Sequence, residues 1–520
     1  MLWSCLAGVR FGACFLPARF VPLHVYLDLT ALTLSLQEKP RDTPMTSDEW
    51  PPVIDHDDPR GPKPPCTATL LTPIQSIPAE IIREVFIFSL PRNLNYCQPH
   101  ICTAPLQVSH VCSTWRRIAL GTPQLWASVA INVGFLGHET EIEVVKRNSE
   151  VIRQWFSRAG QHQALSLQYL GTALTPSANL LGIILPYLNQ LRELRVQLAD
   201  ALPLYTLLAT AELERLEILD FLVLSDNLSG PQDRFSFWNA SCLHKLIASF
   251  AYANQHLEDW RRFARWAQLT SLTLNFVDAQ VWVPLLAECV NLQEGTFRVS
   301  ALGLDDVPDL SQTVSVELKR LTFLDVSFDE LRSIEIFDGF RFPNLTSFRI
   351  GGLTESSWLS PGHFYEQVKS LQSLSYQGSP VGLIELLYHT HSVVDLDIST
   401  SVTDLDLFFR AMQVKDEDKV LLPKLENLSL HDSTQSWPIQ GLYDMLKSRT
   451  IGHTPPSVCP LKYFSIESGG SEPRCNCLRS LQVGGLPVLD LYMGCDCVLC
   501  CAGEETDWDT DLSDSDKWGC

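Results

Sequence analysis

The stretch Leu269-Thr270-Ser271-Leu272-Thr273-Leu274 has apolar side chains at its first, fourth and sixth positions. Its last two leucines are two residues apart, the period at which side chains of a β-strand point to the same face. We therefore predict a short strand with one buried face. The pattern recurs eleven times, at Leu191/Leu194/Val196, Leu216/Leu219/Phe221, Leu243/Leu246/Ala248, Leu292/Gly295/Phe297, Leu321/Leu324/Val326, Leu345/Phe348/Ile350, Leu371/Leu374/Tyr376, Val393/Leu396/Ile398, Leu425/Leu428/Leu430, Leu461/Phe464/Ile466 and Leu478/Leu481/Val483.

Successive copies of this pattern begin mostly 22 to 29 residues apart. Helix-like runs such as residues 283–289 and 382–387 lie between them. A period of about 20–29 residues is typical of leucine-rich repeats, in which stacked strands and helices share one continuous core. Residues 161–490 therefore resemble an irregular leucine-rich-repeat-like α/β solenoid. Generic α/β packing without a solenoid is the alternative, because the usual asparagine or cysteine after the last strand leucine is missing.

Residues 77–126, upstream of the repeats, have helical periodicity. After Ile77-Pro78, apolar residues at three- and four-residue spacing predict a helix that ends before Pro91. A second helix is predicted from Pro105 to Gly121, and Pro123-Gln124-Leu125-Trp126 forms a short third element. About 50 residues are too few to bury a secure core, so this unit should pack against a partner or the next domain.

The order of these motifs is specific: Ile77-Pro78, then Val111-Cys112-x-x-Trp115-Arg116, then Pro123-x-Leu125-Trp126. In this order, residues 73–126 resemble an F-box, with a longer first connection at residues 91–104. The resemblance implies a small N-terminal three-helix F-box that docks on a Skp-type adaptor and, through it, a cullin. The expected docking residues are Ile77, Pro78, Ile81, Ile82, Phe86, Leu106, Val108, Cys112, Trp115 and Trp126, whereas Val85 and Ile118 are expected to pack internally.

The resemblance implies a substrate-recognition subunit of an SCF-type cullin ubiquitin ligase, whose repeats bind an unknown target protein. Two alternatives stay open: an F-box protein acting outside a ligase, and a non-catalytic repeat scaffold whose helices cap the first repeat. Phosphate loops, His-Glu-x-x-His and Gly-x-Ser-x-Gly motifs are missing from the sequence. We therefore predict that the chain is not an enzyme and needs no cofactor.

The charge balance narrows the possible partners. The 520 residues include 39 Lys+Arg and 60 Asp+Glu, a net charge of −21. Binding to nucleic acid through phosphates needs clustered Lys and Arg, so we expect no nucleic-acid partner. The 16 Cys are spread thinly except near the C-terminus, and their spacing there departs from paired zinc knuckles. No metal site is therefore expected; the weak candidates are Cys475, Cys477, Cys495, Cys497, Cys500 and Cys501.

The remaining segments are predicted to connect or flank the two regions. Residues 1–72 read as an apolar extension and a Pro/Asp-rich linker, mostly disordered, in which charged residues interrupt any membrane span. Residues 127–160 connect the F-box-like unit to the repeats through an amphipathic helix, and residues 491–520 form a Cys-rich acidic tail. Reduced thiols and the lack of a convincing signal peptide favour a cytoplasmic or nuclear location.

Overall fold

The computed structural model divides the chain into two compact units, Met1–Thr72 and Pro73–Cys520. All helices and strands described below belong to the second unit. The expectations for residues 1–72 and for the tail after residue 494 lie outside the described residues. Those residues are 77–91, 98–132, 141–171, 177–198, 207–208, 210–223, 239–250, 264–300, 316–331, 334–353, 364–378, 380–400, 405–415, 420–432, 439–449, 454–468 and 490–494.

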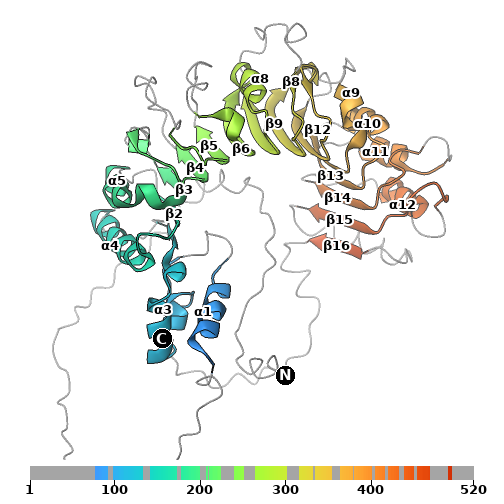
Figure 1. Cartoon of the computed structure of the whole chain (residues 1–520). Helices are drawn as coiled ribbons and strands as arrows, with labels where there is room; N and C mark the ends of the chain where they lie inside the picture. The colour runs from blue at the N-terminus through green and yellow to red at the C-terminus, as the bar shows by residue number, and fades with distance from the viewer. Residues whose placement is uncertain are drawn as a thin grey trace, which may run out of the picture. The chain divides into compact units, whose positions relative to one another are not determined.

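A single sheet of fourteen parallel strands organises the unit Pro73–Cys520. The strands follow one another in chain order, and β8 (Val316–Glu317) and β10 (Phe340–Arg341) pair separately. Figure 1 shows the strands side by side along a curve with helices on its outer side. The fourteen strands are β1 (Ser128–Asn132), β2 (Leu165–Leu170), β3 (Leu191–Leu198), β4 (Ile218–Val223), β5 (Lys245–Phe250), β6 (Ser271–Asp278), β7 (Glu294–Ser300), β9 (Phe323–Leu331), β11 (Ser347–Leu353), β12 (Ser373–Gly378), β13 (Asp395–Thr400), β14 (Asn427–Asp432), β15 (Tyr463–Ser468) and β16 (Asp490–Gly494).

The repeated apolar pattern accounts for these strands. Every described copy begins two residues before a strand, or at its first residue in β3, and its last two positions lie within that strand. In β6, Leu272 and Leu274 are buried, whereas Ser271 and Thr273 between them are partly exposed. The copy at residues 478–483 lies outside the described residues. The prediction of a mixed α/β fold is therefore confirmed, and its strands form one large parallel sheet.

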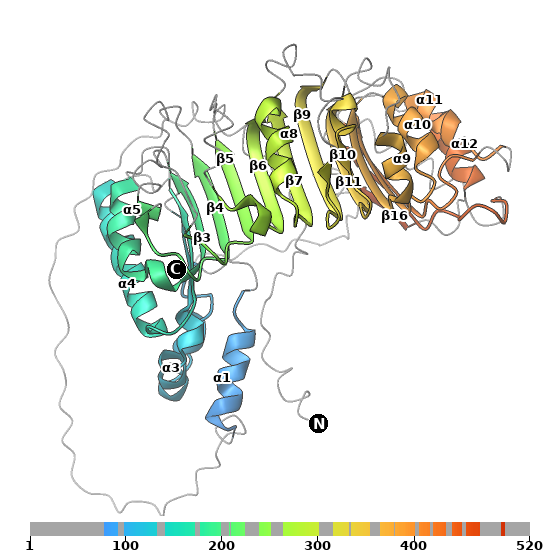
Figure 2. The same ribbon diagram turned by 45° about the horizontal axis from the view of Figure 1, so that its top comes forward.

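The helices follow the strands and cover one face of the sheet, as Figure 2 shows. The helix-like runs at residues 283–289 and 382–387 fall largely within α8 (Ala279–Glu288) and α10 (Pro380–His389), as predicted. Asp278 directly precedes α8, and its side chain accepts a hydrogen bond from the Gln280 backbone N–H at 2.8 Å and so caps the first turn. The other helices of this face are α4 (Glu141–Ala159), α5 (Ser177–Ile184), α9 (Phe364–Gln367), α11 (Leu405–Met412) and α12 (Ile439–Ser448), with 3-10 turns η6 (Leu185–Gln190), η8 (Trp266–Gln268), η11 (Ile334–Phe337) and η13 (Val368–Ser370).

The sheet begins earlier than the expected start of the repeats at residue 161. Strand β1 lies inside the segment expected to be a connection and pairs with β2 over its whole length. Its sequence lacks the leucine pattern, but pairing with β2 buries Val129 and Ile131. The amphipathic helix expected in the same segment is α4, with Ile152, Trp155 and Phe156 buried. At the other end, β16 extends the sheet to Gly494.

Side-chain hydrogen bonds join successive repeats at the start of the strands. Gln268, Asn291, Asn344 and Ser370 each stand directly before the first apolar residue of a strand pattern. Their side chains donate to backbone carbonyls 24 to 28 residues earlier, at 2.7 to 3.3 Å. These polar residues thus pair with backbone carbonyls of the preceding repeat. Each stands before its strand, whereas the asparagine or cysteine usual in leucine-rich repeats stands after it.

One fully buried cation fixes the packing of the last helices. The Arg449 side chain follows α12 and donates from Nε to the Met412 carbonyl at 2.8 Å and from Nη1 to the Leu422 carbonyl at 3.1 Å. Its Nη2 donates to the Leu421 carbonyl. Burial lowers the pKa of Arg449 to about 10, so the guanidinium stays charged at neutral pH. Arg449 therefore ties α12 to the end of α11 and to the segment before β14.

No helix among the described residues is both long and apolar enough to cross a membrane.

Candidate interaction surfaces

The N-terminal helical unit consists of α1 (Ala79–Phe88), α2 (Leu106–Ser109), α3 (Ser113–Leu120) and the 3-10 turn η5 (Pro123–Trp126). Helix α1 follows Pro78 and turns two side chains, Ile82 and Phe86, inward. The ring of Phe86 meets that of Trp115 edge to face, with centroids 5.0 Å apart. This contact joins α1 to α3.

The second helix expected in this unit is divided. Helix α2 ends at Ser109, and α3 starts at Ser113 after an extended Cys112. The Arg116 side chain donates from Nε to the Ser109 carbonyl at 3.0 Å, which satisfies the end of α2 in place of a continuing helix. The expectation of one helix from Pro105 to Gly121 was therefore wrong, because the apolar period does not register a local break of the backbone.

Trp126 connects the helical unit to the sheet. It is fully buried, and its Nε1 donates to the Ala119 carbonyl at 2.9 Å. Its ring packs edge to face on Trp155 of α4, with centroids 4.9 Å apart, and the Arg158 guanidinium carbon lies 4.5 Å from its centroid. Trp155 in turn donates from Nε1 to the Ser128 carbonyl of β1 at 3.0 Å. The unit and the sheet thus share one core across the boundary expected at residue 126.

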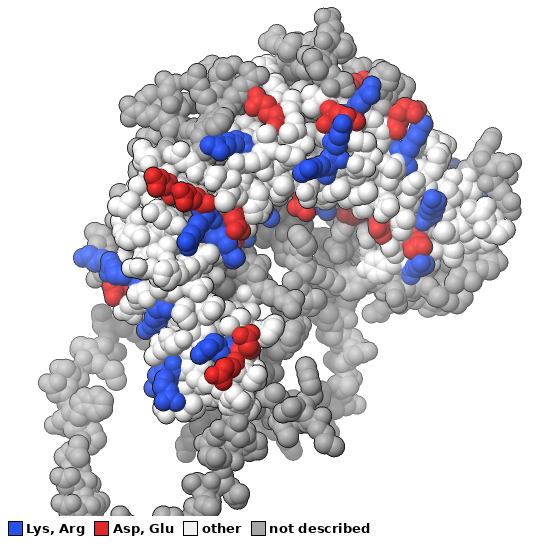
Figure 3. Space-filling model, in the orientation of Figure 1, with Lys and Arg blue, Asp and Glu red and all other residues white. Residues whose placement is uncertain are grey.

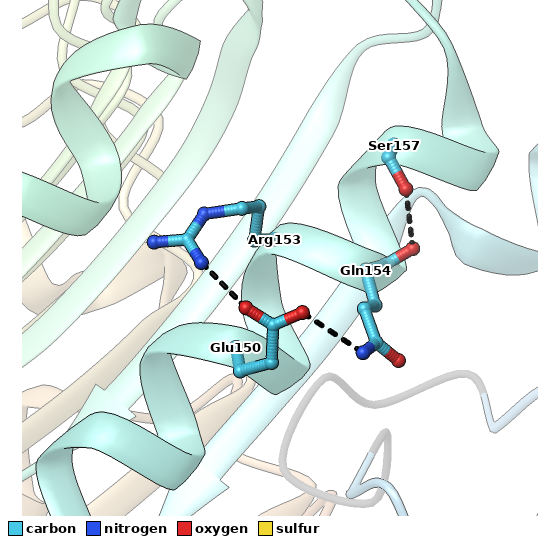
Figure 4. A network of polar contacts seen from close by, with 4 residues as sticks. All are labelled: Glu150, Arg153, Gln154 and Ser157. Carbon is cyan, nitrogen blue, oxygen red and sulfur yellow. Dashed lines mark hydrogen bonds and ion pairs between the residues drawn. The ribbon is translucent and has the colours of Figure 1, made fainter.

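The opposite face of α4 is polar and exposed, and Figure 4 shows four of its side chains. Glu150 accepts hydrogen bonds from Gln154 at 2.9 Å and from Arg153 at 2.5 Å. Ser157 donates to the Gln154 carbonyl at 2.8 Å. The hydrogen bond from Gln154, together with the charge of Arg153, lowers the pKa of Glu150. On the other side of α4, Ile152, Trp155 and Phe156 are buried, together with Ala159.

Helix α1 leaves a stripe of apolar side chains in solvent. Ile81, Val85 and Phe88 are 54%, 49% and 84% exposed and recur at the helical spacing of four and three residues. Eleven large apolar side chains are exposed among the described residues, and six of them lie between residues 81 and 120: Ile81, Val85, Phe88, Ile101, Val111 and Leu120. The helical unit is therefore the part of the described chain richest in uncovered apolar surface.

The expected docking residues divide between the interior and the surface. Ile82, Phe86 and Trp126 are buried in the core of the chain, where they contribute to packing and not to a free surface. Val85 is exposed, contrary to the expectation of internal packing, whereas Ile118 is buried as expected. Pro78, Ile81 and Cys112 are exposed; Ile77, Leu106, Val108 and Trp115 are partly exposed.

The concave face is the sheet face opposite the helices, formed by the strand residues that alternate with the buried leucines. Polar contacts run across it from β9 to β14. The Arg349 guanidinium lies 3.6 Å from an Asp325 oxygen, and its Nε donates to Ser375 Oγ at 3.2 Å. Ser375 donates to Asp397 at 3.1 Å, and His431 Nε2 lies 2.8 Å from the other Asp397 oxygen. In the sequence, this face could have been recognised from the polar residues that alternate with the apolar residues of the repeated strand pattern.

Charges are mixed on the face of the molecule that Figure 3 shows. Figure 3 shows Lys and Arg side chains interspersed with Asp and Glu side chains over the described part of the face in view. Neither sign covers a continuous area of that face. No group of three or more His, Cys, Asp or Glu among the described residues is placed to hold a metal ion. The six weak zinc candidates, from Cys475 to Cys501, lie outside the described part of the chain.

Asp220 of β4 is the most perturbed carboxylate described on the concave face. Burial raises the pKa of Asp220 to about 6, although the charges of Arg195 and Lys245 oppose the shift. Arg195 stands opposite Asp220 in the register of β3 and β4, but its Nε donates to Glu193 at 2.6 Å. Arg195 is thus shared between two carboxylates, and Asp220 is left with a net penalty on its charged form.

The raised pKa of Asp220 predicts that the free energy of unfolding depends on pH. The pKa of Asp220 is higher in the folded state than the ordinary value near 4, so its favourable contribution is complete below pH ~4 and is lost as pH rises through about 6. We expect Asp220→Asn to be more stable than the wild type at pH 8, by at most about 3 kcal/mol, with a smaller difference at pH 4. Urea unfolding at both pH values measures it, with Glu294→Gln of the same face as control. A difference that does not change with pH would contradict this account.

A scan against models of protein families finds no match to this chain. A search of curated proteins finds no similar sequence.

Proposed function

We propose that this chain is the substrate-recognition subunit of an SCF-type cullin ubiquitin ligase. In this proposal residues 73–126 are an F-box that docks on a Skp-type adaptor, and the curved sheet is a leucine-rich-repeat-like solenoid that binds the target protein. The observation that carries the proposal is the exposed apolar stripe Ile81, Val85 and Phe88 on α1, within a segment whose motifs resemble an F-box.

The stripe supports docking because it is unfavourable in a free monomer. Burying a large apolar side chain is worth about 1.5–3 kcal/mol. Three such side chains on one helix face supply the apolar core that a protein interface needs. An adaptor that covers this surface would also complete the small core of the helical unit.

In this proposal the chain contributes to ubiquitin transfer by positioning the target protein. Holding a target on the sheet while the F-box holds the adaptor makes the encounter between target lysine and charged enzyme intramolecular. Such a role requires rigidity between the two binding parts. The Trp126–Trp155 contact supports it, because both rings are buried and belong to the helical unit and to α4.

The proposal is tested by co-expressing the full-length chain with a Skp-type adaptor and measuring co-purification, then adding the cullin and the ubiquitin enzymes. A stoichiometric complex and ubiquitin transfer to a bound protein are expected. A chain that stays monomeric with adaptor present would favour the repeat scaffold. A complex without transfer would favour an F-box protein that acts outside a ligase.

A further inference from the structure

Phe276 lies at an irregular point of the sheet. The register between β6 and β7 shifts between Asn275 and Val277, so Phe276 is an additional residue in its strand. Its φ angle is 63°, in the left-handed region, and its side chain is 39% exposed. The shift lets Val277 take the buried position that strict alternation would give to Phe276. A bulge of this kind re-aims a side chain out of the core.

A second shift in the same sheet shows which residue this backbone favours. The register of β11 with β9 and β12 shifts between Gly351 and Leu353, and Gly352 has φ 75°. A Cβ on Gly352 would lie 1.7 Å from the Phe328 carbonyl oxygen. Glycine adopts this region without steric penalty, whereas a bulky residue there is strained. Phe276 thus occupies an unfavourable conformation that its own packing does not explain.

Arg298 of β7 is next to Phe276 on the concave face. In the strand register Arg298 stands opposite Asn275, and its guanidinium carbon lies 5.3 Å from the Phe276 ring centroid. Asn275 is engaged elsewhere, because its amide donates to Ser249 at 2.6 Å. Burial raises the pKa of Asp325 on the neighbouring strand and the charge of Arg298 opposes this rise, but the ion pair of Asp325 is with Arg349, at 3.6 Å. The Arg298 guanidinium makes no hydrogen bond or ion pair with any residue that the structure describes.

We infer that the Phe276–Arg298 pair anchors an extended segment of the target protein that carries a carboxylate beside an apolar side chain. A guanidinium with open N–H groups binds a carboxylate through two parallel hydrogen bonds. The contact with Phe276 holds that guanidinium in place before binding, which reduces the entropy lost on association. The exposed ring supplies the adjacent apolar contact, and aromatic and arginine residues dominate the binding energy of interfaces.

This inference deepens the proposed function, because it gives the target-binding sheet a place and a ligand chemistry. It does not depend on the adaptor. Adaptor binding and peptide binding can therefore be measured separately on the same purified chain, so that the failure of one is distinguishable from the failure of the other.

The test is a selection of random-sequence peptides displayed on phage against the full-length chain. The selected peptides are expected to share an Asp or Glu next to a large apolar residue. For synthetic copies of these peptides, Phe276→Gly and Arg298→Gln should each raise Kd about tenfold or more, and Arg298→Lys should weaken binding less. Val290→Ala, which changes another exposed apolar residue after α8, serves as the control and should leave Kd unchanged.

A stability measurement separates anchoring from packing. Because Phe276 is strained and half-exposed, Phe276→Gly should unfold at a temperature no lower than the wild type while losing peptide binding. A clear fall in melting temperature would show that Phe276 serves packing and would overturn the inference. Selected peptides without the acidic and apolar pair, or peptides that bind Phe276→Gly and Arg298→Gln as well as the wild type, would overturn it too.

Discussion

Replacing Arg449 by alanine is expected to destabilise the chain by about 3–5 kcal/mol. The substitution removes a fully buried side chain and leaves the carbonyls of Met412 and Leu421 without their donor, whereas the Leu422 carbonyl still accepts from the Leu425 N–H at 3.2 Å. Each buried acceptor left unpaired costs about 1–3 kcal/mol, and the cavity adds to it. Urea unfolding of the full-length protein, followed by circular dichroism, measures the change.

Two further variants show whether the hydrogen bonds or the volume of Arg449 matter. Arg449→Met fills most of the space without donors and should recover only part of the stability. Arg410→Ala is the matched control, because Arg410 on α11 is an exposed arginine paired with Asp406 and should change the stability by less than about 1 kcal/mol. If Arg449→Met were as stable as the wild type, the three carbonyls would not need the guanidinium.

The second large effect is expected on the affinity of the chain for a Skp-type adaptor. The double substitution Val85→Asp and Phe88→Asp should weaken binding of a Skp-type adaptor by about 100-fold or more, because it removes two apolar contacts and places two charges in the interface. Both side chains are exposed in the free chain, so the folded chain itself should be little affected. Titration of the purified adaptor by calorimetry measures the loss.

Controls for this experiment come from the same molecule. Leu407→Asp changes an exposed apolar residue on α11, far along the sequence, and should leave adaptor binding intact. Phe86→Ala removes a buried ring that contacts Trp115 and should lower stability by about 3–5 kcal/mol. Unchanged adaptor affinity in the double variant would contradict docking through the apolar stripe on α1.

A truncated chain should keep Trp126, because this residue belongs to the core that the helical unit shares with the sheet. A cut after residue 126 would remove Trp126 and expose the ring of Trp155 that packs on it. We therefore expect a chain that begins at residue 127 to unfold more readily than one that begins at residue 121 and keeps η5. The melting temperatures of the two truncated chains, measured by circular dichroism, check this expectation. Equal melting temperatures would mean that Trp126 belongs to the helical unit alone.

The strands and the position of the helices could be predicted from the sequence because local periodicity determines them. Leu272 and Leu274 of β6 alternate with partly exposed residues, and the same spacing recurs along the chain. Burial of one strand face is a strong and repeated driving force, so each copy predicts its own strand without knowledge of the others. The helix α4 was predictable for the same reason, from Ile152, Trp155 and Phe156.

The expected docking residues could be assigned only in part. Period alone placed Ile81, Ile82, Val85 and Phe86 on one helix face, yet only Ile82 and Phe86 are buried. Which half of a broad apolar stripe faces inward depends on the partner element, here α3 through Trp115, and a single helix sequence does not contain that information.

By itself, the sequence determined the repeated strand–helix order and the buried face of the strands, because these depend on residues close together in the chain. Only the tertiary structure decided where β1 joins the sheet, that Arg449 binds three carbonyls, and that Phe276 turns outward beside Arg298. Each of these joins groups on different elements of the fold. Their energies depend on distances that folding sets, so no local pattern predicts them.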